Sequence, residues 1–204
     1  MITIVDYGMG NLASVQNMFK RIGAACEITG ELDKISKAQK ILLPGVGAFD
    51  AAISRIDSIG LRSLLSQKAL QEKVPVLGIC LGLQLLTYSS EEGQLPGLGW
   101  IPAKVLKFRF ETGSKLKVPH MGWNEIHIVH PNKLVENLPE EPRFYFVHSY
   151  YAKAEDDKYV IARTNYGHDF DSIITNGDNI FGAQFHPEKS HKFGMKILEN
   201  FASL

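Results

Sequence analysis

One cysteine of the chain stands where a nucleophile would be expected. Residues 78–82 read Gly-Ile-Cys-Leu-Gly, and they join the apolar run Val74–Ile79 to a segment with helical character. This Gly-x-Cys-x-Gly pattern between strand and helix is the cysteine form of a nucleophile elbow, in which small neighbours let the sharp turn close. At a helix N-terminus the macrodipole favours a thiolate, and the N–H of Leu81 would point into the site. We therefore predict that Cys80 is a nucleophile.

A cysteine nucleophile needs a base and a group that orients the base. Of the seven histidines, His186 directly follows the apolar run 180–185, at the expected carboxyl end of a strand, where open parallel sheets form their sites. Glu188 stands two residues further on, and the intervening Pro187 stiffens the segment. The carboxylate can accept from one imidazole nitrogen while the other nitrogen faces the sulfur. The joint occurrence of the elbow and His-Pro-Glu predicts a triad of Cys80, His186 and Glu188.

The first half of the chain alternates strand-like and helix-like segments. Ile2–Asp6, Ile41–Leu43 and Val74–Ile79 are apolar on both faces, as buried parallel strands are. Apolar residues at helical spacing predict one helix within Leu12–Gly23 and another over about Gly60–Gln71. Strands that are each followed by a helix favour a parallel sheet covered by helices.

The second half changes character, because its short strand-like runs are separated by Gly, Asn, Asp and Pro turns. These runs are Val105–Phe108, Phe144–Val147, Tyr159–Ala162 and Ile180–Gln184. We interpret them as antiparallel additions to, and further strands of, the same sheet, and an amphipathic helix closes the chain. With no internal repeat and no linker, the sequence predicts one α/β domain over residues 1–204, with a mostly parallel central sheet flanked by helices.

Composition and charge argue against several classes of function. The 22 basic and 22 acidic residues give a formal net charge of zero and form no basic stripe, which argues against nucleic-acid binding. No apolar run approaches the ~20 residues of a membrane-spanning helix, and no signal peptide is recognisable. The two cysteines, Cys26 and Cys80, are too few for a disulfide framework. We expect a cytoplasmic protein that binds neither nucleic acid nor membranes, in which Cys26 is structural.

Two further patterns compete with the triad. Residues 8–13 read Gly-x-Gly-x-x-Ala between a strand and a helix, as a dinucleotide fingerprint does, and Glu27 or Glu31 could supply its ribose-binding acid. Short glycine patterns recur by chance, however, and this one leaves the triad residues unexplained. His127 and His130 would point to opposite faces of a strand, and no Cys-x-x-Cys is present. We therefore expect neither a metal site nor a cofactor.

Six stretches of the chain carry a family resemblance. Three resemble the class I (triad-type) glutamine amidotransferases: Pro44–Phe49 (Pro-Gly-Val-Gly-Ala-Phe), Gly78–Gln84 (Gly-Ile-Cys-Leu-Gly-Leu-Gln) and Gln184–Glu188 (Gln-Phe-His-Pro-Glu). Three more are similar to the glutaminase subunits of imidazole glycerol phosphate synthases, from histidine biosynthesis: Asp6–Asn11, Pro119–Asn124 and Phe144–Tyr150. The resemblance runs from residue 1 to the C-terminal helix and implies a flavodoxin-like fold.

The resemblance implies that the chain hydrolyses L-glutamine to glutamate and ammonia. Cys80 would attack the side-chain amide carbon and form a cysteinyl thioester. His186 would protonate the departing ammonia and then activate water, while Glu188 holds the imidazole in the correct tautomer.

The same resemblance assigns the groups that would hold the substrate. The oxyanion would be bound by the N–H of Leu81 and by an N–H from the Pro44–Gly47 loop, either that of Val46 or that of Gly47. Gln84 and the backbone around Ser149 and Tyr150 would hold the polar ends of glutamine.

A partner enzyme is implied as well, because these subunits dock on a (βα)₈-barrel cyclase and pass it ammonia internally as a heterodimer. Asn11, Tyr145 and Lys189 would lie at this interface. Similar subunits serve a sugar amidotransferase in surface-polysaccharide assembly, and Lys189–Met195 and Glu91–Trp100 are equally compatible with that group. A Cys-elbow hydrolase and a dinucleotide-binding module are the alternatives from other functional classes.

Overall fold

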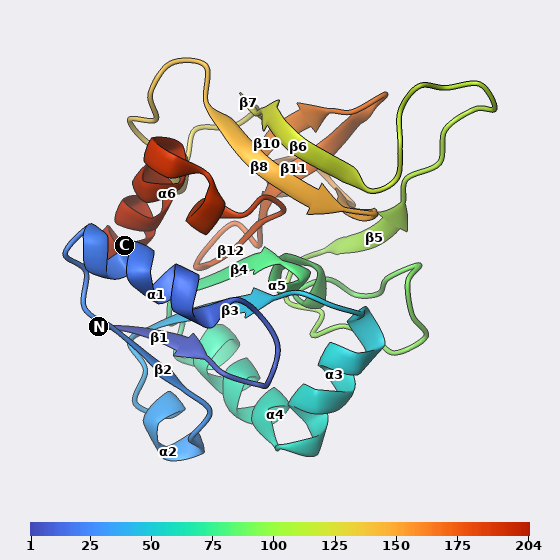
Figure 1. The fold of residues 1–204 in the computed structure, drawn as a ribbon. Coiled ribbons are helices and arrows are strands. Elements are labelled where there is room, and N and C mark those ends of the chain that lie inside the picture. The colour runs from blue at the N-terminus through green and yellow to red at the C-terminus, as the bar shows by residue number, and fades with distance from the viewer.

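An eight-stranded sheet forms the centre of the protein, which we describe from a computed structural model of residues 1–204 (Figure 1). Its strands are β1 (Ile2–Val5), β2 (Cys26–Thr29), β3 (Lys40–Gly45), β4 (Val76–Cys80), β7 (His127–Ile128), β10 (Val160–Asn165), β11 (Asp169–Thr175) and β12 (Ile180–Ala183). The order across the sheet is β2-β1-β3-β4-β12-β11-β10-β7. Pairs up to β12 are parallel, and those beyond it are antiparallel. Two antiparallel pairs complete the strands: β5 (Ala103–Lys107) with β9 (Tyr150–Ala154), and β6 (His120–Glu125) with β8 (Arg143–His148).

Successive side chains of the strands point to opposite faces of the sheet, and both faces are apolar. Helices therefore cover both faces and form two separate hydrophobic cores. Ile4 and its neighbours on one face pack with α1 (Leu12–Arg21) and α6 (His191–Ser203). Val5 and the other face pack with α3 (Phe49–Ser58) and α4 (Leu61–Ser66), which Figure 1 shows below the sheet. The remaining helical segments are α2 (Leu32–Ile35), α5 (Leu81–Leu85), the π-helix η1 (Gln67–Gln71) and the 3₁₀ turns η2 (Lys133–Val135), η3 (Asp157–Tyr159) and η4 (Pro187–Lys189). No helix combines the length and apolar character needed to span a membrane.

The α/β class with a mostly parallel sheet and added antiparallel strands is confirmed, and each predicted strand or helix has a counterpart in the structure. The prediction that all strands belong to one sheet is wrong for β5 and β8, because each forms a separate antiparallel pair outside the central sheet. The sequence did not reveal α3 or the strands β2, β6, β9 and β11. β11 was not predicted because buried polar residues interrupt the apolar pattern by which a buried strand is recognised. Asp171 within it is 1% exposed, where its carboxylate accepts from Arg163 Nε at 2.9 Å and from the Ala154 N–H at 2.9 Å.

Three neighbouring parallel strands end at one edge of the sheet. Gly45 at the end of β3 lies beside Cys80 at the end of β4, and Ala183 at the end of β12 lies beside Ile79. Loops that leave this edge therefore start close together, which is the arrangement that places sites at the carboxyl ends of parallel strands.

Candidate active site

Cys80 occupies a strained turn between β4 and α5. Its φ of 53° is in the left-handed region, which a residue with a side chain adopts only when the surroundings enforce it. The two glycines of the motif make that turn possible. A Cβ on Gly82 would lie 1.8 Å from the carbonyl oxygen of Leu43, and one on Gly78 would lie 2.7 Å from the backbone of Gly82. The sulfur is thus fixed at the N-terminus of α5 by backbone packing that only glycine permits.

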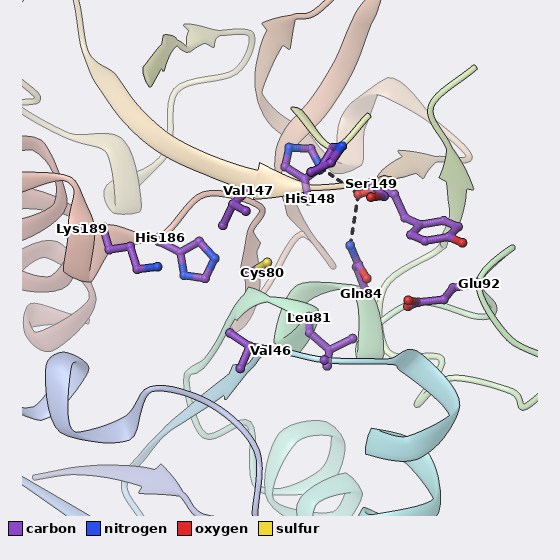
Figure 2. Close-up of a pocket in the computed structure, with 13 residues that line it drawn as sticks. Val46, Cys80, Leu81, Gln84, Glu92, Val147, His148, Ser149, His186 and Lys189 are labelled. Carbon is purple, nitrogen blue, oxygen red and sulfur yellow. Dashed lines mark hydrogen bonds between the residues drawn. The ribbon is translucent and has the colours of Figure 1, made fainter. Parts of the chain in front are cut away.

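His186 and Glu188 lie in the turn that follows β12. His186 Nδ1 is 2.8 Å from Glu188 Oε1, and the two side chains are only 2% and 3% exposed. The backbone holds this turn in place, since the His186 N–H donates to the Tyr145 carbonyl at 2.9 Å and the Ser190 hydroxyl donates to the His186 carbonyl at 2.6 Å. The other ring nitrogen, Nε2, is buried without a hydrogen-bond partner, and Figure 2 shows the imidazole beside the sulfur of Cys80.

The electrostatics of the imidazole follow from these neighbours. Burial alone would lower the pKa of His186, but its interactions with the nearby sulfur of Cys80 and the carboxylate of Glu188 outweigh burial and raise the pKa to about 10. The structure therefore favours a protonated imidazole beside the Cys80 sulfur at neutral pH, and a neighbouring cation of this kind is what activates a cysteine nucleophile.

Two segments bring backbone N–H groups to the pocket that contains Cys80. Leu81 is the first residue of α5, where N–H groups have no intrahelical acceptor. Val46 and Gly47 follow β3, and neither of their N–H groups donates a hydrogen bond within the protein. All three residues line the same pocket as Cys80. The Tyr7 hydroxyl steadies the start of this loop by donating to the Pro44 carbonyl at 2.6 Å.

The pocket above the sulfur has a volume of about 350 Å³ and is lined by both polar and apolar groups. Gln84, Ser149 and Tyr150, which the resemblance assigns to glutamine binding, all line this pocket. Their polar groups are not equally free, however. The Tyr150 carbonyl already accepts from Gln84 Nε2 at 3.1 Å and from His148 Nδ1 at 2.8 Å. Gln84 Oε1 and the N–H and hydroxyl of Ser149 have no partner in the protein and remain available to a ligand.

Two residues that line the pocket or lie next to it were not predicted from the sequence. Glu92 enters the pocket on the side opposite His186 (Figure 2), and its Oε2 accepts from the N–H of Phe49 at 3.0 Å. Gln184 is fully buried, with Nε2 3.8 Å from Cys80 Sγ and Oε1 3.4 Å from Gln84 Nε2. Gln184 could have been found from its place two residues before His186. Nothing local to Glu92 indicates its position.

Two of the three residues predicted for a partner interface lie next to each other in the structure. Lys189 Nζ lies over the Tyr145 ring, 5.5 Å from its centroid, whereas the Asn11 side chain accepts from the Ser14 N–H at the start of α1 and does not join this pair. Two apolar side chains extend the surface, because Met121 and Trp123 are 63% and 48% exposed. Trp123 packs edge-on against Tyr145, with their ring centroids 6.3 Å apart.

Two structural observations bear on the competing patterns. Nowhere do three or more His, Cys, Asp or Glu side chains come together as metal ligands. In the glycine-rich segment 8–13 the Gly8 N–H donates to Asp6 Oδ1 at 2.9 Å, so this amide is already engaged within the loop.

The sequence model of the family "Glutamine amidotransferase class-I" matches residues 3–203. The imidazole glycerol phosphate synthase subunit HisH 2 of Methanococcus maripaludis is 54% identical over 201 residues, which cover 98% of each chain. The subunit HisH of Leptospira interrogans is 48% identical, with 100% of each chain covered. Two solved structures share the fold: a glutamine amidotransferase (TM-score 0.75, 17% identity, 100% of each chain) and PurLQS from Thermotoga maritima (TM-score 0.71, 19% identity, 99% of this chain and 97% of that one). The chain belongs to the class I glutamine amidotransferase family.

Proposed function

We propose that the chain is the glutaminase subunit of a two-component imidazole glycerol phosphate synthase and supplies ammonia to a cyclase subunit. The names of full-length relatives at 45% to 54% identity support this assignment over a sugar amidotransferase partner. One observation carries the chemistry: His186 has Nδ1 bound to Glu188 and a buried, unpartnered Nε2 beside Cys80. That is the geometry of a base oriented toward a nucleophile.

In the first half-reaction, the Cys80 thiolate attacks the side-chain amide carbon of glutamine, and the carbonyl oxygen becomes an oxyanion. The N–H of Leu81 and that of Val46 or Gly47 would stabilise this charge. The carbon–nitrogen bond then breaks as His186 Nε2 gives its proton to the departing nitrogen. Ammonia leaves, and a glutamyl thioester remains on Cys80.

In the second half-reaction, the neutral imidazole takes a proton from water as the water oxygen attacks the thioester carbon. The carbon–sulfur bond breaks, glutamate is released, and the thiolate faces the imidazolium again. Glu188 accepts from Nδ1 throughout, so that Nε2 alone exchanges the proton. We also infer a cytoplasmic location, because this cycle needs a reduced thiol and both cysteines are free.

Charge in the pocket gives glutamine one orientation. Glu92 is the acidic side chain of the pocket lining, with one carboxylate oxygen bound to Phe49 and the other without a partner. We infer that this oxygen and Gln84 Oε1 receive the α-ammonium group, while the N–H and hydroxyl of Ser149 receive the α-carboxylate. The side-chain amide then reaches Cys80.

A reactive glutamine analogue tests the chemistry. 6-Diazo-5-oxo-L-norleucine should modify Cys80 alone, as read by peptide mass spectrometry, and Cys80→Ser should release no ammonia from glutamine in the presence of the cyclase. Cys26→Ser is the matched control and should retain both reactions. Ammonia release by Cys80→Ser, or labelling confined to Cys26, would show that the site is assigned wrongly.

Substrate orientation has its own test in Glu92→Gln. The amide oxygen of Gln can still accept from Phe49 and keep α3 in place, but the charge is gone. We expect the KM for glutamine to rise by roughly 10- to 100-fold, as for the loss of a charged hydrogen bond, with little change in iodoacetamide alkylation of Cys80. An unchanged KM would remove Glu92 from the binding site.

The docking surface is proposed to consist of Met121, Trp123, Tyr145 and Lys189 at the mouth of the pocket. Its occupant would be the (βα)₈-barrel cyclase of a heterodimer. Trp123→Ala should weaken cyclase binding by about 30-fold or more, the scale of an interface hot spot. Leu32 is similarly exposed (44%), and the helix α2 that carries it lies on the other side of the molecule from β6 and β8 in Figure 1, so Leu32→Ala is the control for calorimetric titration. Equal affinities for the two variants would place the interface elsewhere.

A further inference from the structure

A line of polar side chains, of which His120 and His148 are buried and Asn124 is half-buried, runs up to the pocket, where His148 forms part of the lining. His120 and His148 are directly opposite each other on β6 and β8, with His120 Nδ1 3.1 Å from His148 Nε2. His148 Nδ1 continues the line to the Tyr150 carbonyl at 2.8 Å, and Asn124 Nδ2 extends it at the other end, 3.3 Å from His120 Nε2. Aromatic rings surround the line, among them Tyr166, whose ring stacks on His120 with centroids 4.0 Å apart.

Proton positions in this line follow from its acceptor end. A carbonyl oxygen can only accept, so His148 Nδ1 must carry a proton. Burial lowers the pKa of His148 to about 3, which leaves the ring neutral and its Nε2 without a proton. His120 Nδ1 must then be the donor between the two rings. Burial also lowers the pKa of His120 to about 4, so its own Nε2 is an acceptor.

The orientation of the Asn124 amide, at the other end of the line, follows from separate hydrogen bonds. Asn124 Oδ1 accepts from the N–H of Glu125 at 2.9 Å, and its Nδ2 donates to the Asn165 carbonyl at 2.8 Å. The amide therefore presents N–H, not oxygen, to His120 Nε2. All hydrogen bonds of the line run in one direction, from Asn124 through His120 and His148 to the Tyr150 carbonyl, and no alternative proton arrangement satisfies every group.

We propose that Asn124, His120 and His148 form a one-directional hydrogen-bond relay that positions the Tyr150 carbonyl and, through it, the substrate-binding face of Gln84. This inference rests on the proposed glutaminase function. The Tyr150 carbonyl accepts from Gln84 Nε2, so it decides that Gln84 presents its oxygen to the pocket, where an ammonium group needs an acceptor. His148 and Tyr150 flank Ser149, which lines the pocket and whose N–H and hydroxyl have no partner in the protein, and the relay therefore fixes this part of the wall as well. The three relay members are positioning residues and touch no reacting atom.

Two substitutions of His120 separate the relay from simple packing. His120→Phe keeps an aromatic ring against Tyr166 but provides no donor for His148. His120→Asn loses the ring but places an amide N–H near the position of Nδ1. We expect His120→Phe to raise the KM for glutamine about tenfold, the scale of one lost buried hydrogen bond, and His120→Asn to stay within about threefold of the wild type. His168, which packs on Tyr151 outside the relay, supplies the control His168→Phe, with an unchanged KM.

A pair of thiol reagents distinguishes positioning from loss of fold. Labelling of Cys80 by 6-diazo-5-oxo-L-norleucine needs the substrate wall, whereas alkylation by iodoacetamide needs only the reactive thiol. His120→Phe should slow the first about tenfold and leave the second within about twofold. The proposal is overturned if His120→Asn is as damaging as His120→Phe, or if His120→Phe labels like the wild type.

The wild-type protein provides a test that no folding defect can obscure. Nitrogen-15 NMR of the imidazole rings should show His120 and His148 neutral, each with Nδ1 protonated and Nε2 bare. A protonated Nε2 on either ring would overturn the relay even if the variants behave as expected. If wild-type protein with its cyclase releases no ammonia from glutamine, the proposed function fails, whereas these nitrogen signals still decide the relay.

Discussion

Replacing Glu188 by glutamine removes one negative charge from His186 and leaves the side-chain shape nearly unchanged. The rise of the His186 pKa from 6.5 to about 10 corresponds to about 5 kcal/mol of interaction favouring the imidazolium. Both Cys80 and Glu188 contribute to it, and an opposite charge at hydrogen-bond distance typically accounts for about 1–3 pH units. We therefore expect Glu188→Gln to lower the pKa of His186 by about 1–2 pH units. Cys80→Ser removes the other charge and should lower it as well.

The sign of the pH dependence follows from the direction of this pKa change. The folded-state pKa of His186 lies above its ordinary value, so protonation of the ring stabilises the folded protein. That contribution is complete below about pH 6.5 and is lost as the pH rises toward 10. In Glu188→Gln the loss should begin at the same pH but be smaller and end at a lower pH, and urea unfolding between pH 6 and 10 should reveal it.

Three measurements check the prediction in one set of samples. NMR titration of the His186 ring should give a pKa near 10 in the wild type and a lower one in Glu188→Gln and in Cys80→Ser. The rate at which iodoacetamide alkylates Cys80 should begin to reflect the loss of the imidazolium at a lower pH in Glu188→Gln than in the wild type, because the ring of the variant loses its proton at a lower pH. Glutamine turnover with the cyclase should fall about 10⁴-fold, the order of the loss when the carboxylate of a serine protease triad is replaced.

Two outcomes would refute this reasoning. If wild-type His186 titrates near its ordinary value, the imidazole does not share a proton with the thiol, and the thiolate–imidazolium pair is not the resting state. If Glu188→Gln keeps its turnover within about tenfold, the carboxylate does not orient the base in the way that triads require.

Two further predictions concern the scaffold that positions the site. Gly82→Ala would place a methyl group 1.8 Å from the Leu43 carbonyl and should lower the free energy of unfolding by more than about 3 kcal/mol, whereas Gly23→Ala, at φ +74° with open space around it, should cost about 1–2 kcal/mol. Equal losses in urea unfolding would mean that the backbone at the elbow can move aside. Tyr7→Phe leaves the Pro44 carbonyl without its 2.6 Å hydrogen bond and should cost about 1–3 kcal/mol, with slower thioester formation because the loop after β3 is less ordered. Unchanged stability together with unchanged single-turnover labelling would contradict that role.

Local pattern was sufficient to predict the elbow and the orienting pair. The glycines that make the turn at Cys80 lie within two positions of it, and Glu188 is two residues from His186. Short stretches of sequence are therefore enough to predict their chemical roles. Their mutual proximity also follows from the sheet, since β4 and β12 are parallel neighbours and end at the same edge. A parallel sheet was predictable from strands that are apolar on both faces.

The relay could not be predicted in the same way. His120 and His148 are 28 positions apart in the chain, and their contact depends on the register of an antiparallel pair. A slip of one residue would turn one ring to the opposite face of the sheet. The sequence offers two histidines in strand-like surroundings, and only the three-dimensional pairing decides that one ring donates to the other.

Glu92 explains why neither α3 nor the group proposed to bind the ammonium was predicted from the sequence. A helix start is normally visible as a capping side chain at the N-cap, but Ala48 occupies that position before α3 and cannot cap. The missing acceptor comes from Glu92, 43 residues away, whose Oε2 receives the Phe49 N–H. That interaction also brings the second carboxylate oxygen to the pocket, so a single long-range hydrogen bond both begins the helix and supplies the charge that would orient the substrate. Neither the start of α3 nor the charge in the pocket can be predicted from local sequence, because both depend on the packing of the segment around Glu92 against the N-terminus of α3.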